Sequence, residues 1–147
     1  MKSIFLSAAL AICLFATASG TREKSVANYR IIQSFNEEFG RVENLKWSSA
    51  MNNLVKADFE LDNETMSAYF DENGEYVAST KIISLDQLPK KLQASIKEKV
   101  GDAKIDQVFE MTSIREKSFF VETTSNNEKK VWKGDSFGKL TRYYLKP

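Results

Sequence analysis

The chain has 147 residues, of which 21 are Lys or Arg and 20 are Asp or Glu, with no histidine and a single cysteine, Cys13. A net charge of +1 gives no broad basic field, so we expect neither nucleic acid nor an anionic membrane surface as a partner. The lack of histidine removes the commonest general base and the commonest metal ligand together.

Residues 1–18 have the pattern of an export signal. Lys2 supplies a positive start, residues 4–15 form an apolar run, and an Ala-Thr-Ala cleavage site follows directly. The run is shorter than the roughly 20 residues that cross a bilayer. Lipid attachment at Cys13 would need small residues before the cysteine, and Ile12 is bulky. We therefore predict a cleaved signal peptide, a periplasmic or secreted protein, and no stable membrane insertion after cleavage.

Removal of that signal leaves about 129 residues, with 20 basic and 20 acidic side chains and no cysteine. A chain of this length buries about two-thirds of its unfolded surface without disulfides. Without cysteine it also has no thiolate metal site. We expect a single domain at residues 22–147.

Residues 26–39 show the spacing of an amphipathic helix. Polar residues fill its other side, and Gly40 follows where a left-handed cap would end it. A short strand is predicted next, at residues 42–47. The residues predicted to share the buried stripe of the helix recur every three or four positions: Val26, Tyr29, Ile32, Phe35 and Phe39.

Residues 54–83 predict an antiparallel meander of three strands. The first run, residues 55–61, alternates apolar and charged side chains, so one of its faces is buried. Turn formers separate the runs, and Asn73-Gly74 is expected to supply the positive φ angles of a tight hairpin. Asp71 with Asn73 resembles the start of a calcium loop, but the later oxygen ligands and the closing glutamate are missing. A plain hairpin is favoured.

The second half of the chain repeats this order of signals. Ser84 and Gln87 fit a capping box, and Gly101 stands just past the end of the next apolar stripe. That stripe consists of Leu88, Leu92, Ile96 and Val100. Four further strands are predicted at residues 104–112, 118–124, 128–133 and 139–145.

The two halves also share their turn sequences. Residues 62–64 align with residues 126–128, and residues 71–74 align with residues 135–138. Each half is therefore a helix followed by four antiparallel strands, and two such units cover their sheets by pairing into one layered domain. We predict an α+β fold of two tandem repeats, each one helix plus a four-stranded antiparallel meander, with the helices packed on one face of the sheet: repeat one at residues 22–83 and repeat two at residues 84–147.

Few catalytic arrangements remain available to this chain. Ser136 matches the bare G-x-S-x-G and S-x-x-K patterns, but it lies within the predicted turn at residues 135–138, and the chain has no histidine to act as a base for a serine. No glycine-rich phosphate loop is present. Asp58 and Glu60 point the same way from one strand, but such alternation is typical of the solvated face of a half-buried sheet. We expect no enzyme activity, no catalytic or metal-binding residues and no cofactor. A hydrolase that uses only carboxylates is a remote alternative.

Four aromatic side chains are candidates for binding a partner. Tyr69 alternates with the core residue Phe70, so we expect it on the outer face, exposed unless another element covers it. Trp47 either rims the sheet or closes the core, and the facing of Trp132 is open. Tyr143 and its neighbour Tyr144 point opposite ways, so one of them is expected outside. Large aromatics on an open sheet anchor protein partners, although each also fits under a loop or helix.

The duplicated unit resembles a known family. A helix that starts at Leu88-Pro89, a strand that ends Phe-Asp-x-Asn-Gly at residues 70–74, and a signal peptide before the repeats resemble the bacterial PepSY-like family, also labelled beta-lactamase-inhibitor-like. The resemblance covers residues 44–145. It implies a periplasmic or secreted, non-enzymatic domain, and inhibitors of this architecture grip an enzyme with an open, aromatic-rich sheet face. The chain departs from them because it lacks cysteines after the signal and has Gly134 where repeat one has an aromatic residue.

Two classes of function follow from these features. The first is an exported binding module that holds another protein or a cell-envelope component on one sheet face, with inhibition of a secreted or periplasmic hydrolase as one form. The second is an envelope protein with a structural or solute-binding role, with a pocket between the helices and the sheet.

Overall fold

The computed structural model describes residues 26–144. The predicted signal peptide at residues 1–18, including Cys13, lies outside these described residues. Between them the elements follow in the predicted order, a helix and four strands twice, with two short 3-10 helices marked η: α1 (Tyr29–Phe39), β1 (Glu43–Ser49), η2 (Met51–Asn53), β2 (Val55–Leu61), β3 (Glu64–Phe70), β4 (Tyr76–Ile82), η3 (Leu85–Gln87), α2 (Lys90–Val100), β5 (Lys104–Ser113), β6 (Lys117–Ser125), β7 (Glu128–Gly134) and β8 (Leu140–Tyr143).

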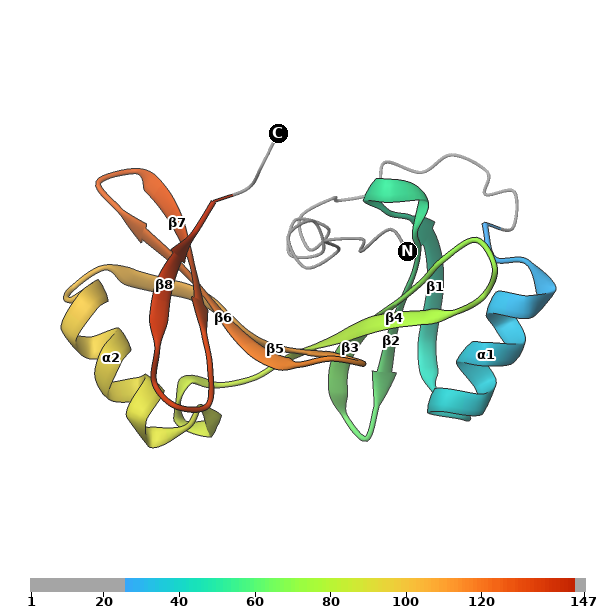
Figure 1. Cartoon of the computed structure of the whole chain (residues 1–147), viewed down its shortest axis with the longest axis horizontal. Coiled ribbons are helices and arrows are strands. Elements are labelled where there is room, and N and C mark those ends of the chain that lie inside the picture. Colours follow the sequence, from blue (N-terminus) through green and yellow to red (C-terminus); the bar gives the residue numbers. More distant parts are fainter. Residues whose placement is uncertain (1–25, 145–147) are drawn as a thin grey trace.

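The eight strands form one antiparallel sheet in which the strand order equals the chain order, from β1 to β8. The repeats meet where β4 pairs with β5, from Ile82 opposite Phe109 to Ala78 opposite Ser113. Figure 1 shows β3 to β6 spanning the middle of the molecule, with one helix at each end. The sheet is continuous across the repeats, and the predicted α+β fold of two helix-plus-meander units is confirmed.

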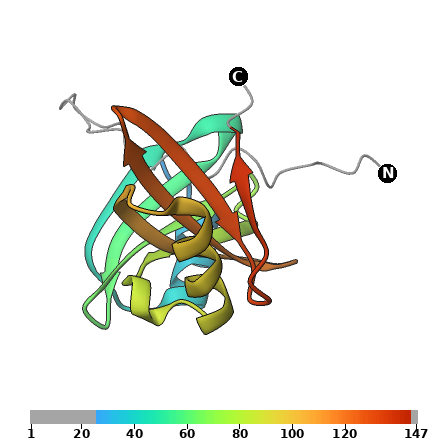
Figure 2. The ribbon, with the colours of Figure 1, turned by 90° about the vertical axis from the view of Figure 1, so that its left-hand side faces the viewer.

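Both helices cover the same face of the sheet. Side chains alternate between the two faces along a strand, and the pairing registers place the residues under α1 and those under α2 on one side. Figure 2, viewed from the end that carries repeat two, shows α2 lying across the strands of that repeat. We call the opposite surface the helix-free face; its central and flanking residues are Lys56, Asp58, Ser67, Tyr69, Ala78, Thr80, Gln107, Phe109, Met111, Phe120, Glu122, Val131 and Tyr143.

The helix α1 packs on the sheet through aromatic rings. The ring centroid of Phe35 lies 5.2 Å from that of Trp47 and 5.0 Å from that of Phe59, with interplanar angles of 70° and 88°. Phe70 lies 6.2 Å from Phe35 in a similar edge-on arrangement. Such pairs contribute about 0.5–1.5 kcal/mol each beyond their burial. Aromatic contacts therefore dominate the core of repeat one.

The helix α2 packs through aliphatic side chains instead. Leu92 and Ile96 are buried together with Val121 and Leu140. A Cβ atom added at Gly134 would lie only 2.5 Å from Leu92 Cδ1. The glycine therefore leaves the space that Leu92 occupies, and this explains why repeat two lacks an aromatic residue at that position.

The buried stripe of α1 differs from the prediction. Asn28 caps the helix by accepting the Ile31 N–H at 3.0 Å, and the face toward the sheet carries Ile31 and Phe35, each 1 % exposed. Tyr29 is 78 % exposed and Ile32 is 39 % exposed, so their predicted places on this stripe are wrong. At about 100° of rotation per residue, Tyr29 lies about 160° and Ile32 about 100° from Ile31 around the helix axis.

The turn at residues 71–74 is a hairpin turn, as favoured. The Asp71 carboxylate accepts the N–H groups of Asn73 and Glu75 at 2.9 and 2.8 Å, and these bonds stabilise the turn. Gly74 has a positive φ of +89°, whereas Asn73 does not, contrary to the expectation for both residues. Hairpin loops of this length are built around a type I turn, which needs the left-handed conformation only at its end.

Repeat two builds the same turn against its own helix. Asp135 accepts the N–H groups two and four residues later at 2.9 and 3.0 Å. A Cβ atom added at Gly74 would lie 2.9 Å from Arg30 in α1, and one added at Gly138 would lie 2.9 Å from Lys91 in α2. Each turn therefore presses on the second residue of its helix, which shows that the two units are built alike.

Candidate functional site

The centre of the helix-free face is a closed apolar cluster. The rings of Phe109 and Phe120 stack with centroids 5.1 Å apart and planes 7° apart. Because the cluster is buried, the accessible part of this face is the polar and half-buried surface around it. Six residues form the cluster, each at most 5 % exposed: Leu54, Tyr69, Ala78, Phe109, Met111 and Phe120.

Tyr69 lies on the predicted face but is 0 % exposed. Strand alternation determines the side on which a residue lies, not what covers it. Here Leu54, from the segment before β2, and Phe109, from β5 of the other repeat, belong to the same buried cluster. Tyr69 is expected to be exposed unless another element covers it, and the continuous sheet supplies that cover by bringing residues of repeat two into the same cluster.

Tyr143 marks the rim of this cluster. Its ring meets Phe120 edge-on, with centroids 5.4 Å apart and an interplanar angle of 88°. Burial raises the pKa of the Tyr143 hydroxyl above its ordinary value. Tyr144 points the other way and is 67 % exposed, with the Arg142 guanidinium 5.0 Å from its ring centroid. As expected of adjacent strand residues, one tyrosine of the pair lies outside.

The two tryptophans lie on the face covered by the helices. Trp47 packs with Phe35 of α1, and Trp132 lies against the α2 cluster, where its Nε1–H donates to Thr123 Oγ1 at 3.1 Å. The four predicted partner-binding residues therefore form no single patch, since only Tyr69 and Tyr143 share the helix-free face. Their role in binding a partner stays a prediction.

A polar pocket of about 270 Å³ opens on the helix-free face beside the cluster. Lys56 Nζ lies 2.8 Å from Asp58 Oδ1, and the Ser67 hydroxyl donates to the same oxygen. Lys56 is only 8 % exposed although it carries a charge. Burial of a cation is tolerated when the cation is paired and hydrogen-bonded. The pocket is lined by Lys56, Asp58, Thr65, Ser67, Thr80, Ile82 and Gln107.

Glu122, on β6, is another acidic residue of this face and is only 7 % exposed. It pairs across the sheet with Gln107 on one side and Val131 on the other, and Val131 in turn pairs with Tyr143. Loss of hydration raises the pKa of the Glu122 carboxyl to about 7, a shift that nearby Lys129 reduces. Seven ion pairs join side chains within the described part of the chain, and none includes Glu122.

Asp58 and Glu122 occupy equivalent positions in the two repeats. Asp58 lies on β2, opposite Ser67 of β3, and Glu122 lies on β6, opposite Val131 of β7. In the alignment of the two repeats, Val131 of repeat two therefore stands at the position of Ser67 in repeat one. Phe120 likewise stands at the position of Lys56, because each lies two residues before its carboxylate. Repeat two thus keeps the carboxylate and loses both partners.

Glu122 is not among the candidate residues predicted from the sequence, although the sequence contains one signal for it. The run from Ser118 to Thr124 is strand-like and mostly apolar, and Glu122 lies two residues after Phe120, hence on the same face. A carboxylate on the same side of a strand as a core aromatic residue is unusual, and it indicates a candidate functional residue. Its burial, however, depends on contacts from β5, β7 and β8 that no local pattern contains.

The carboxylates weighed for a hydrolase do not form a catalytic pair in this geometry. The described contacts of Asp58 are with Lys56 and Ser67, and Glu60 is exposed and stands opposite Thr65. Among residues 26–144, no group of three acidic, histidine or cysteine side chains could hold a metal ion.

Comparison with known proteins gives a similarity in fold. No protein-family model and no curated protein matches the chain. A solved DUF2874 family protein from Bacteroides uniformis superposes with a TM-score of 0.73 at 15 % identity, covering 79 % of this chain and 87 % of that chain. A BLIP-like protein from Bacteroides fragilis gives a TM-score of 0.70 at 17 % identity, with coverages of 83 % and 86 %.

A third solved structure, from Bacteroides eggerthii, is described as one of the "putative periplasmic proteins" and superposes with a TM-score of 0.72 at 14 % identity, covering 79 % of this chain and 88 % of that chain. The chain therefore has the BLIP-like α+β fold, and the resemblance to beta-lactamase-inhibitor-like proteins is confirmed at the level of fold. In the part of the chain that the structure describes, no helix is both long and apolar enough to cross a membrane.

Proposed function

We propose that this chain is an exported, non-enzymatic protein that holds a protein partner on the helix-free face of its sheet. The observation that carries this proposal is the placement of both helices on one face of the continuous eight-stranded sheet. The other face offers a polar pocket and a half-buried aromatic rim at Tyr143. Aromatic side chains with a polar surround are typical of protein-binding surfaces.

Export to the periplasm or the medium is part of the proposal. The predicted signal peptide at residues 1–18 supports it, as does the similarity in fold to a Bacteroides eggerthii protein described as "putative periplasmic". The likeness to a BLIP-like protein favours inhibition of an exported hydrolase as one form of binding. A cell-envelope component is the other class of partner that an exported protein of this kind meets.

A photo-cross-linking residue placed on each face tests this function. Thr65 and Thr141 are exposed on the helix-free face, whereas Glu37 and Lys97 are exposed on the outer sides of α1 and α2. In the producing cell we expect one stoichiometric protein adduct from the first pair and none from the second. The purified partner should then bind the protein, with an affinity that Tyr143→Ala weakens. Equal labelling from both pairs, or no adduct from either, would contradict the proposal.

A solute-binding role is the second candidate, because a hollow of about 490 Å³ lies beside α2 and the start of β5. Its lining combines apolar residues with the charged residues Lys90 and Lys97. A small molecule that co-purifies with the protein and is lost on Ile105→Arg would favour this candidate over the first. The residues that line this hollow include Leu85, Lys90, Ile96, Lys97, Val100 and Ile105.

A further inference from the structure

We propose that Glu122 is the receptor for one cationic side chain, a lysine ammonium or an arginine guanidinium, of the protein that occupies the helix-free face. This inference rests on the proposed function for the existence of that partner. It goes further because it states the chemistry of the contact and the residue that makes it.

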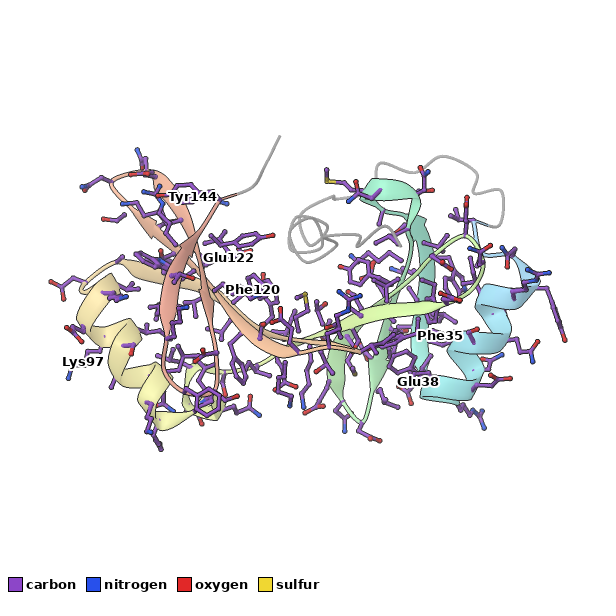
Figure 3. All side chains as sticks on the ribbon, viewed as in Figure 1. Phe35, Glu38, Lys97, Phe120, Glu122 and Tyr144 are labelled. Atoms are coloured by element: carbon purple, nitrogen blue, oxygen red, sulfur yellow. The ribbon has the colours of Figure 1, made fainter. Side chains whose placement is uncertain are left out.

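The position of Glu122 suits a contact with a partner. The residue is more than nine-tenths buried by its neighbours, and Figure 3 shows it with Phe120 on the side of the sheet away from α2, whereas Lys97 lies on the outer side of that helix. Neither carboxylate oxygen of Glu122 is a fully enclosed atom without a hydrogen-bond partner. A group that approaches along the helix-free face can therefore reach the carboxylate.

The charges around Glu122 leave its carboxylate without an ion pair in the described part of the chain. On β5, Asp106 repels it and is itself bound by Thr124 and Lys104. On β7, Lys133 is paired with Glu116 at 2.7 Å. The charges of Asp106 and Lys133 are therefore each paired with another side chain, and neither residue forms an ion pair with Glu122.

Two further groups, Lys129 and Tyr143, belong to the surroundings of Glu122. Lys129, on β7, attracts the carboxylate but does not come within ion-pairing distance of it. Tyr143, on β8, is neutral near pH 7 because burial raises its pKa further above that of an ordinary tyrosine. A carboxylate that has lost water without gaining a cation binds an incoming cation more strongly than an exposed one does.

The other repeat provides an internal comparison. The equivalent carboxylate, Asp58, has Lys56 Nζ at 2.8 Å and the Ser67 hydroxyl on the same oxygen. At Glu122 these places are taken by Phe120 and Val131, neither of which can donate a hydrogen bond. The fold therefore supplies a cation to this position in one repeat, and in the other we assign that task to the partner.

The apolar neighbours of Glu122 favour an organic cation over other ligands. Phe120 and Tyr143 meet edge-on beside it, and aromatic rings attract ammonium and guanidinium groups. A metal ion would need several oxygen ligands, and no group of three acidic side chains occurs among residues 26–144. The proton is the main competitor, since the pKa of Glu122 is about 7.

The test uses a single-cation probe and its neutral counterpart. N-acetyl-argininamide and N-acetyl-citrullinamide have nearly the same shape, but only the first is charged. Each is titrated into the isotope-labelled protein at pH 8 while the amide resonances of β5 to β8 are followed by NMR. We expect the arginine probe to shift the resonances of Gln107, Glu122 and Val131, with a dissociation constant on the order of millimolar for one such contact.

Two variants make the result specific. In Glu122→Gln we expect the affinity for the arginine probe to fall at least about tenfold, because a charged hydrogen bond is lost. The exposed residue Glu98, on α2, provides the matched control, and Glu98→Gln should bind as the unaltered protein does. At pH 6 the binding should weaken about tenfold relative to pH 8, since protonation neutralises the carboxylate.

Equal binding of the arginine and citrulline probes, binding unchanged in Glu122→Gln, or no binding of the arginine probe would each overturn this inference. These outcomes are independent of the cross-linking result. A partner captured on the helix-free face with no probe binding at Glu122 would leave the proposed function standing and remove the cation receptor. Probe binding at Glu122 without any adduct from Thr65 or Thr141 would do the reverse.

Discussion

Repeat one and repeat two are built on one plan and filled with different side chains. Their helices present buried residues at matching positions, Ile31 and Phe35 in α1 and Leu92 and Ile96 in α2. Their turns use the same aspartate contacts and the same glycine approach to the helix. The core of repeat one is rich in aromatic rings, whereas the core of repeat two is mostly aliphatic, with Phe119 and Trp132 as its aromatic members. The plan therefore constrains turns and spacing more than it constrains core composition.

The helix-free face differs more than the cores do. Repeat one places a bonded group of Lys56, Asp58 and Ser67 there, and repeat two places a lone carboxylate, Glu122, beside Phe120. Asp58 contacts both Lys56 and Ser67, whereas no ion pair in the described part of the chain includes Glu122. The proposed contact with a cation of the partner would supply in repeat two the charge that Lys56 supplies in repeat one.

The largest effects are expected in the two cores. Phe35→Ala should lower the free energy of unfolding by about 4 kcal/mol and Ile96→Ala, its equivalent, by about 3 kcal/mol, because a larger cavity opens in repeat one. Chemical denaturation of both variants measures the difference. Ile32→Ala, at an exposed position of α1, should cost less than about 1 kcal/mol. A greater loss for Ile96→Ala than for Phe35→Ala would contradict the description of an aromatic core in repeat one.

The turn glycines should give equal effects. Gly74→Ala and Gly138→Ala each place a Cβ atom 2.9 Å from helix atoms at a positive φ, so each should cost about 2 kcal/mol or more. Thermal unfolding of the pair, with the exposed turn variant Ser136→Ala as a near-neutral control, checks this. Losses that differed by more than about 2 kcal/mol would show that the turns are not equivalent.

At pH 8 we expect Asp58→Asn and Glu122→Gln to change the free energy of unfolding in opposite directions. Asp58→Asn should destabilise the protein by about 1–2 kcal/mol, because Lys56 and Ser67 lose the carboxylate that both contact. Glu122→Gln should stabilise it by about 1–3 kcal/mol, because a carboxylate without an ion pair is no longer buried. Denaturant titrations of both variants measure these changes. Destabilisation by Glu122→Gln at pH 8 would contradict the account of Glu122.

The pH dependence of the Glu122 effect follows from its raised pKa. The folded protein holds this proton up to about pH 7, and the unfolded chain releases it near 4.5. Between these values the folded state binds more protons, so this group's contribution to stability is present at low pH and is lost as the pH rises toward 7. The gain from Glu122→Gln should therefore be small at pH 5 and complete at pH 8.

Local sequence determined the framework well. The strands follow from alternation, and the two-residue turns Asp62-Asn63 and Asn126-Asn127 follow from residues that tolerate the positive φ that all four adopt. Gly134 was noted as a departure from repeat one, yet its contact with Leu92 needs the helix in place.

The burial of a side chain is harder to predict from the sequence than the face of the sheet on which it lies. Strand alternation predicts the correct face for Tyr69, but a residue that helps to bury it, Phe109, comes from β5, forty residues further along the chain. The burial of Glu122 is also not evident from the local sequence, because three neighbouring strands, and not its own strand, exclude water from it. The faces of Trp47 and Trp132 were left open by the sequence, and the structure places both under the helices.

A carbon-detected NMR titration of the Glu122 side-chain carboxyl, with and without N-acetyl-argininamide, tests the assignment of this residue most directly. We expect a midpoint near pH 7 in the protein alone and a lower midpoint with the probe, because a bound cation favours the ionised form. A midpoint near 4.5, the ordinary value, or one that the probe leaves unchanged, would contradict the account of Glu122 as a receptor waiting for a cation.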